Sequence, residues 1–496
     1  MRAQEFIIAL DQGSGSSRAL AFDARGRVAA RAQAPLRTFY PRPGWVEQDA
    51  EEIFRGQVKA LDAVLSRLPR SARVSGLGFA CQRSTVVLWD SRTGKPLCRA
   101  LSWQDGRASN WTAGLGQHQG SVHEKTGLYL TAYYSAPKIR WLLDHSPAVR
   151  QAARRGRLRA GPVASYVLWR LTRGRTLAAD PSLAQRMLLM DVRALQWDAQ
   201  LLSLFGLSDG MLPKIMPSAG EWGVLARAGR KIPILAVLGD QQSAALALGG
   251  SELGAGVLNY GTGAFFLLNT GPQAFKVPGL LASVAWQKAG QPCHYFQEGT
   301  VHAAGTSLQW LQKNWKFIER LDRVDAMCRD SKRRVWALQA IGGLGAPRWD
   351  YSTWTAYAGL TSESTPKDIV RGVVEGIAFL IADIVSAAGS AGLDVRALRA
   401  SGGLSRSRHL LQFQADLLQL PIRLGAEQEA TAAGIAFLAA EGAGRPWARH
   451  LLADRGTREF RPKMSREEAS RLLAAWRLFV ETQQKLSSEM RRLGAW

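Results

Sequence analysis

The sequence predicts an α/β protein that consists of two similar halves. The chain has 496 residues, of which 46% are apolar and 21% charged, so it can fill large hydrophobic cores. Strand-like and helical patterns alternate along most of the chain, and one glycine-rich hairpin pattern occurs twice. At about 150 residues per domain, the length fits three domains or two large ones and excludes a single small binding module.

The first hairpin lies close to the N-terminus. The β-prone run Phe6–Leu10 is followed by a polar turn at residues 11–17 and by a second strand at Ala19–Phe22. The same order of strand, turn and strand returns at Val257–Tyr260, Gly261–Gly263 and Ala264–Leu268. We therefore expect a duplicated fold with one copy of the hairpin in each half.

Further strands and helices are expected between and after the hairpins. In the first half, strand patterns occupy Val74–Ala80 and Thr85–Trp89, and helical patterns occupy Ile139–Leu143 and Val163–Leu171. In the second half, Thr365 and Pro366 are typical of a helix start, and the apolar residues behind them recur at helical spacing. This helix is expected to face the core.

The C-terminal third suggests a nucleotide platform and a terminal helix. A strand at Leu398–Ser401, the turn Gly402-Gly403 and a helix at Leu410–Leu418 would point helix N-terminal amides at the turn. Ser465 predicts the cap of a last helix whose apolar face suits packing. We expect an N-terminal domain over 1–248, a C-terminal domain over 249–445 and a helical tail over 446–496.

The charge and the cysteine content limit the classes of binding partner and the cellular compartment that we expect. Lys and Arg number 64 against 40 Asp and Glu, a net charge of +24, but the Arg residues are scattered and the densest cluster, 150–159, lacks aromatic residues for base stacking. Four cysteines without CxxC spacing predict reduced thiols in a cytoplasmic protein. The uncharged stretch 253–275 contains several glycines that are typical of turns, so we expect no membrane span. Because the Arg residues are scattered, we expect no nucleic-acid binding either.

The first hairpin tip can bind phosphate. No GxxxxGK[ST] segment occurs, and the tip lacks the third glycine of a dinucleotide fingerprint. Backbone amides of a tight turn still form an anion-binding concavity, to which Ser14, Ser16 and Ser17 add donors and Arg18 adds a positive charge. Asp11 beside them could hold Mg²⁺ through water. Alone, such a tip is more often a structural turn, but its pairing with Gly261–Gly263 favours phosphate.

Six segments, in chain order, resemble the FGGY family of carbohydrate kinases and within it the branch that acts on glycerol. They are Ala9–Arg18, Pro43–Asp49, Gly239–Gln242, Tyr260–Gly263, Gly299–Leu311 and Gly343–Pro347. The resemblance extends from about residue 5 to 440. It implies two ribonuclease-H-like domains of the actin/hexokinase type with an interdomain cleft, and ATP- and Mg²⁺-dependent phosphorylation of a hydroxyl group of a small polyol or sugar.

The resemblance also implies the site residues. It places the polyol against Arg83, Trp103, Tyr133, Asp240, Gln241 and Phe265, and the nucleotide against Ser14, Ser16, Arg18, Thr262, Gly305, Gln309 and Gly403. Asp240 is the candidate base for the hydroxyl proton, since it lies on a turn within a long apolar stretch. Without the resemblance, Asp240 would equally suit the N-cap of a helix over 241–248.

Four positions depart from the family pattern. Ser84 follows Arg83 where the family has Glu, which enlarges the polyol pocket, removes a carboxylate and predicts a larger polyol or ketose as the alternative substrate. Gly15 replaces a Thr and Ser407 an Asn, which predicts weaker contacts to triphosphate or adenine. Trp354 replaces an Arg in a stretch linked to regulation, so the family's regulation is not carried over. A homo-oligomer is compatible with the sequence.

Two other classes of function are alternatives to the kinase. A non-kinase ATPase on the same actin-type scaffold would hydrolyse ATP whatever polyol was added, because fold alone does not fix function. A nucleic-acid-binding protein would rest on the net charge alone.

Overall fold

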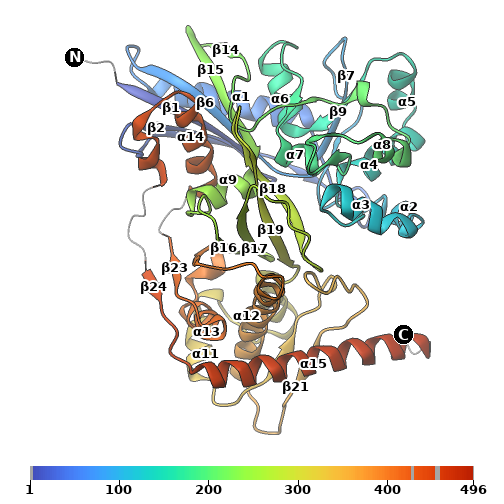
Figure 1. Cartoon of the computed structure of the whole chain (residues 1–496), viewed down its shortest axis with the longest axis vertical. Coiled ribbons are helices and arrows are strands. Elements are labelled where there is room, and N and C mark those ends of the chain that lie inside the picture. Colours follow the sequence, from blue (N-terminus) through green and yellow to red (C-terminus); the bar gives the residue numbers. More distant parts are fainter. Residues whose placement is uncertain (1–3, 426–428, 453–457, 495–496) are drawn as a thin grey trace.

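The computed structural model describes residues 4–425, 429–452 and 458–494. The first half of the chain forms the upper part of the molecule in Figure 1 and the second half the lower part, with β18 (Leu281–Gln287) and β19 (Cys293–Val301) running between them. Each half contains a large mixed sheet with helices packed on it. The predicted α/β class and the duplication are therefore confirmed.

The sheet of the first half has the strand order β14–β15–β6–β1–β2–β3. Its strands are β1 (Glu5–Gln12), β2 (Ser16–Asp23), β3 (Val28–Pro35), β6 (Arg73–Cys81), β14 (Val224–Arg227) and β15 (Arg230–Gly239). β1 is antiparallel to β2 and parallel to β6. Alternate residues of β1 face opposite sides, so that Ile8 packs toward α1 (Ala50–Arg67) and Ile7 toward α14 (Ala430–Gly442).

The sheet of the second half repeats this core arrangement. Its order is β18–β19–β17–β16–β22–β23–β24, and β16 is antiparallel to β17 and parallel to β22. The further strands are β16 (Ala255–Tyr260), β17 (Ala264–Gly271), β22 (Ala397–Ser401), β23 (Ile422–Leu424) and β24 (Arg458–Phe460). β16 thus lies between one antiparallel and one parallel strand, as β1 does. This places the two glycine-rich turns at equivalent points of the two sheets.

A smaller sheet extends the first half. It has the order β4–β5–β8–β7–β9 and carries helices on its flanks. The elements are β4 (Thr38–Phe39), β5 (Glu47–Gln48), β7 (Val86–Asp90), β8 (Ala100–Leu101), β9 (Leu158–Pro162), α4 (Ser135–His145), α5 (Pro147–Arg154), α6 (Val163–Leu171) and α8 (Ala199–Phe205). This part carries several of the residues expected to bind the polyol.

Shorter elements connect these parts. They are α2 (Ser109–Ala113), α3 (Gln119–Thr126), β10 (Ala178–Ala179), α7 (Pro181–Gln185), β11 (Met190–Asp191), β12 (Gln196–Trp197), β13 (Lys214–Ile215), α9 (Asp240–Ala247), α10 (Gly305–Trp310), α11 (Val324–Asp330), β20 (Trp336–Leu338) and β21 (Ala356–Ala358).

The expected core and terminal helices are both present. α12 (Pro366–Ser390) is largely buried, and α15 (Arg466–Arg492) crosses the lower part of the molecule in Figure 1. Trp476 of α15 is fully buried, lies 4.9 Å from the Phe379 ring and donates through Nε1 to Asp383 at 2.9 Å. The terminal helix is thus packed on the rest of the protein, as predicted, and the contacts of Trp476 place it on the second half.

α14 lies late in the chain but packs on the first half. A Cβ atom on Gly78 of β6 would lie 2.6 Å from the Ile435 carbonyl oxygen, so only glycine permits this approach.

The domain boundaries at residues 248 and 445 remain predictions. No described helix is long and apolar enough to cross a membrane, and all four cysteines are free thiols.

Candidate active site

The first hairpin brings Asp11 and Arg18 together. They face each other in the β1–β2 register, and the Arg18 guanidinium donates to the Asp11 carboxylate at 2.5 and 3.1 Å. Burial raises the pKa of Asp11, although Arg18 acts against this. Arg18 also donates to Glu429, which directly precedes α14, at 2.7 Å. Arg18 therefore joins the hairpin to a segment from the other end of the chain.

The hairpin tip also contacts the aromatic residues predicted to face the polyol. The Trp103 indole N–H donates to Ser14 Oγ at 2.9 Å, and Ser14 Oγ donates to Gln82 at 2.9 Å. The Trp103 ring lies 5.7 Å from the ring of Tyr133. Trp103 therefore connects the turn expected to bind phosphate with the aromatic side chains expected to contact the polyol.

Arg83 is held by a carboxylate from the second half of the chain. It follows β6 and donates through both Nη atoms to Glu298 of β19, at 3.0 and 3.2 Å. Arg186 donates to the same carboxylate at 2.5 Å. Burial would raise the pKa of Glu298, but the two guanidinium groups lower it to about 2, so Glu298 is ionised at neutral pH.

Ser84 adopts a strained backbone conformation. Its φ is +62°, and its Oγ is buried without a hydrogen-bond partner. The buried Lys138 ammonium donates to the carbonyl oxygens of Ser84 and Tyr133 at 3.3 and 2.7 Å, which fixes the loop. Burial lowers the pKa of Lys138 to about 7.

Asp240 is the first residue of α9 and is half-buried. The N-cap is Gly239, while Asp240 Oδ1 accepts the Gln241 backbone N–H at 2.8 Å. Burial raises the pKa of Asp240 to about 6, with Arg83 acting against this and Asp11 adding to it. A carboxylate with a pKa near 6 suits general-base catalysis at neutral pH. Gln241 Oε1 accepts from the Asn259 amide at 3.4 Å, a contact to β16.

The second hairpin forms a tight glycine-lined corner with α10. The Gly305 N–H donates to the Gly261 carbonyl at 3.0 Å, and a Cβ atom on Gly305 would lie 2.6 Å from that oxygen. The Thr262 carbonyl accepts the backbone N–H groups of Ala304 and Thr306. Gly403 follows the positive-φ Gly402, and nothing lies within 4 Å of the position a Cβ would occupy on it. The platform therefore presents backbone rather than side chains.

Five other predicted nucleotide and polyol residues have different environments. Gly15 and Gln309 are exposed, and Ser16 and Phe265 are half-buried. Ser407 is the N-cap of α13 (Arg408–Leu418): it accepts the Leu410 N–H at 3.2 Å and donates to Asp325. Its hydroxyl is thus already engaged, which leaves its proposed contact to a nucleotide a prediction.

The structure also shows residues that the sequence analysis missed. Glu298 and Arg186 complete the contacts of Arg83, Lys138 supports Ser84, and Glu429 binds Arg18. Glu298 directly precedes the family-like segment Gly299–Leu311. This place in the sequence is a signal by which Glu298 could have been found, whereas Arg186, Lys138 and Glu429 have no such signal.

The residues present fit ATP and Mg²⁺. Within the described ranges no group of three or more His, Cys, Asp or Glu side chains could enclose a metal ion. Mg²⁺ in kinases commonly uses one or two carboxylates together with substrate phosphates and water, and Asp11 is a buried carboxylate beside the phosphate turn. The open space at Gly403 leaves room for a phosphate group to approach the backbone there.

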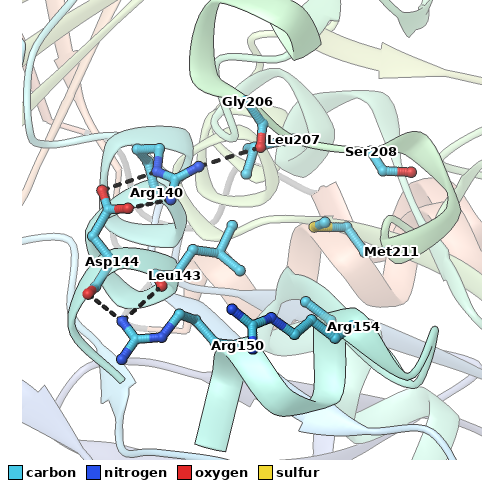
Figure 2. Close-up of a pocket in the computed structure, with 10 residues that line it drawn as sticks. Arg140, Leu143, Asp144, Arg150, Arg154, Gly206, Leu207, Ser208 and Met211 are labelled. Carbon is cyan, nitrogen blue, oxygen red and sulfur yellow. Dashed lines mark hydrogen bonds and ion pairs between the residues drawn. The ribbon is translucent and has the colours of Figure 1, made fainter. Parts of the chain in front are cut away.

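A separate hollow of about 550 Å³ lies where α4, α5 and the end of α8 meet. Figure 2 shows Arg140 paired with Asp144 and Arg150 donating to the carbonyl oxygens of Leu143 and Asp144. These contacts stabilise the C-terminal end of α4. None of the predicted site residues lines this hollow.

The fold and the site define a two-domain carbohydrate kinase of the actin/hexokinase-like type. Residues 6–247 match the N-terminal domain, and residues 256–443 the C-terminal domain, of the FGGY family of carbohydrate kinases. The chain belongs to this family.

Named relatives and solved structures agree with this assignment. The glycerol kinase of Alkalilimnicola ehrlichii is 40% identical over 99% of this chain and 98% of that protein, and that of Dechloromonas aromatica is 39% identical over 97% and 98%. The structure of Plasmodium falciparum glycerol kinase with ADP has a TM-score of 0.91 at 28% identity, covering 97% of this chain and 98% of that chain. A gluconate kinase from Lactobacillus acidophilus, 19% identical with a TM-score of 0.88 over 99% and 100%, shares the fold.

Proposed function

We propose that this carbohydrate kinase transfers the γ-phosphoryl group of ATP to a hydroxyl group of glycerol or a related small polyol, with Asp240 as the general base. The observation that carries the proposal is the Asp240 carboxylate, whose pKa is raised to about 6 beside the buried Arg83. Such a carboxylate is ionised at pH 7.5 and basic enough to accept a hydroxyl proton as the oxygen attacks phosphorus. The full-length similarity to glycerol kinases supports the choice of substrate.

The remaining groups have complementary roles in this proposal. Arg83 donates to a polyol hydroxyl, and the Trp103 and Tyr133 rings pack against the carbon chain. Arg18 and the amides of both glycine-rich turns bind the phosphate oxygens. Asp11 would hold Mg²⁺, which when bound neutralises phosphate charge. The Plasmodium relative was solved with ADP, which supports a nucleotide as one of the two substrates.

A larger polyol or a ketose is the second candidate, and Ser84 favours it. A Glu in its place would supply a carboxylate acceptor for hydroxyl groups, whereas Ser84 supplies a smaller neutral hydroxyl that is buried and unpartnered. A substrate with an additional carbon and hydroxyl would use both the space and the unpartnered atom.

The test is ADP release in the presence of ATP and Mg²⁺ with glycerol, tetritols, pentitols, pentuloses and hexuloses, against a blank without acceptor. The proposal predicts turnover with glycerol or another short polyol well above the blank. Turnover confined to pentitols or ketoses would assign the site to the second candidate. ADP release equal to the blank with every acceptor would contradict both.

A further inference from the structure

Three buried charged side chains meet where the two halves of the chain join. Glu298 of β19 contacts Arg83, which follows β6, and Arg186, which follows α7. The three side chains are 2–4% exposed. Ser283 of β18 donates to the same carboxylate at 2.9 Å. Glu298 therefore accepts hydrogen bonds from four donor atoms, of which two belong to Arg83.

We propose that Glu298 is the positioning residue that holds the Arg83 guanidinium in its polyol-binding orientation. This inference rests on the proposed function and adds a residue that acts through Arg83. A bidentate pair fixes the plane of a guanidinium as well as its location. Both Nη atoms of Arg83 are held, so its orientation is determined by a residue 215 positions away.

The charge balance shows why a carboxylate is needed here. Arg83 and Arg186 bring two buried positive charges, and Glu298 brings one negative charge. Asp240 supplies the second negative charge and interacts with both arginines. Without Glu298, two guanidinium groups would repel each other beside the polyol and Arg83 would be free to turn toward Asp240.

The position of Glu298 also links substrate binding to the join between the halves. Arg83 belongs to the first half and Glu298 to a strand of the second-half sheet. Arg83 is therefore oriented for polyol binding only when the two halves are in the arrangement that forms the Arg83–Glu298 pair. This predicts that loss of Glu298 weakens polyol binding more than nucleotide binding.

The primary test compares Glu298→Gln with Ser283→Ala. Glutamine keeps the size of the side chain but removes the charge that binds both Nη atoms. We expect the KM and the calorimetric Kd for the best polyol of the panel to rise about 10- to 100-fold, with KM for ATP within about threefold of wild type. Ser283→Ala removes one neutral donor to the same carboxylate and does not touch Arg83, so KM for the polyol should stay within about threefold.

A double variant separates positioning from stability. Glu298→Gln alone leaves two buried cations with only the Asp240 carboxylate to balance them, and this excess positive charge lowers the denaturation temperature. Arg186→Gln combined with Glu298→Gln removes the excess charge, so the denaturation temperature should recover while the polyol KM stays high. This double variant also serves if Glu298→Gln does not fold.

Three outcomes decide the inference. A polyol KM within about threefold of wild type in folded Glu298→Gln or in the double variant overturns it. Equal increases in the KM values for polyol and ATP also overturn it, since they indicate a general structural effect. Wild-type protein without polyol-dependent turnover would instead contradict the proposed function, before any variant is compared.

Discussion

Replacing Asp240 with Asn should change activity and stability in opposite directions. The amide cannot accept the hydroxyl proton, so kcat should fall about 10²-fold or more while KM for the polyol changes little. In the wild type, burial raises the carboxyl pKa from an ordinary value of 3.8 to about 6. This difference costs the folded protein about 3 kcal/mol once the carboxyl is ionised. Asp240→Asn removes that cost, so the variant should resist denaturant better at pH 8.

The sign of the pH dependence follows from the raised pKa. A raised carboxyl pKa favours the folded state while the group is protonated and disfavours it as the pH rises through 6. The stability advantage of Asp240→Asn should therefore shrink between pH 6 and 4. The wild-type kcat/KM should fall below pH 6, by about tenfold at pH 5. Wild-type turnover in Asp240→Asn, or lower stability than wild type at pH 8, would refute the reasoning.

Three further predictions concern other parts of the molecule. Ser84→Glu should raise kcat/KM for glycerol relative to five-carbon polyols by about tenfold, and an unchanged ratio would show that Ser84 does not set specificity. Arg18→Ala should raise KM for ATP about tenfold or more and KM for the polyol much less; a larger effect on the polyol would argue against a phosphate contact. Trp476→Ala removes the stack on Phe379 and the hydrogen bond to Asp383 and should cost about 3–5 kcal/mol of unfolding free energy. Its kcat at 25 °C should match wild type if α15 serves packing alone.

The features that the sequence predicted well are local in the chain. The two hairpins, the start of α12 at Pro366 and the cap of α15 at Ser465 depend on turn residues and apolar spacing within about ten residues. The second hairpin in particular could be recognised because strand, glycine turn and strand are consecutive.

The features that the sequence did not predict depend on which strands become neighbours. The Arg83–Glu298 pair joins residues 215 positions apart, and the Arg186–Glu298 pair joins residues 112 apart. No local pattern marks a glutamate in an apolar strand as the partner of two arginines. The packing of α14 on the first sheet is a similar case, because its apolar sequence suits either half.

The central claim is that the phosphoryl group passes to a polyol hydroxyl rather than to water. The most direct measurement is ³¹P NMR of the wild-type protein with ATP, Mg²⁺ and the best acceptor of the panel. The account predicts a phosphomonoester signal that grows in step with ADP, with little inorganic phosphate. ADP accompanied by an equal amount of inorganic phosphate, and no phosphomonoester, would contradict it.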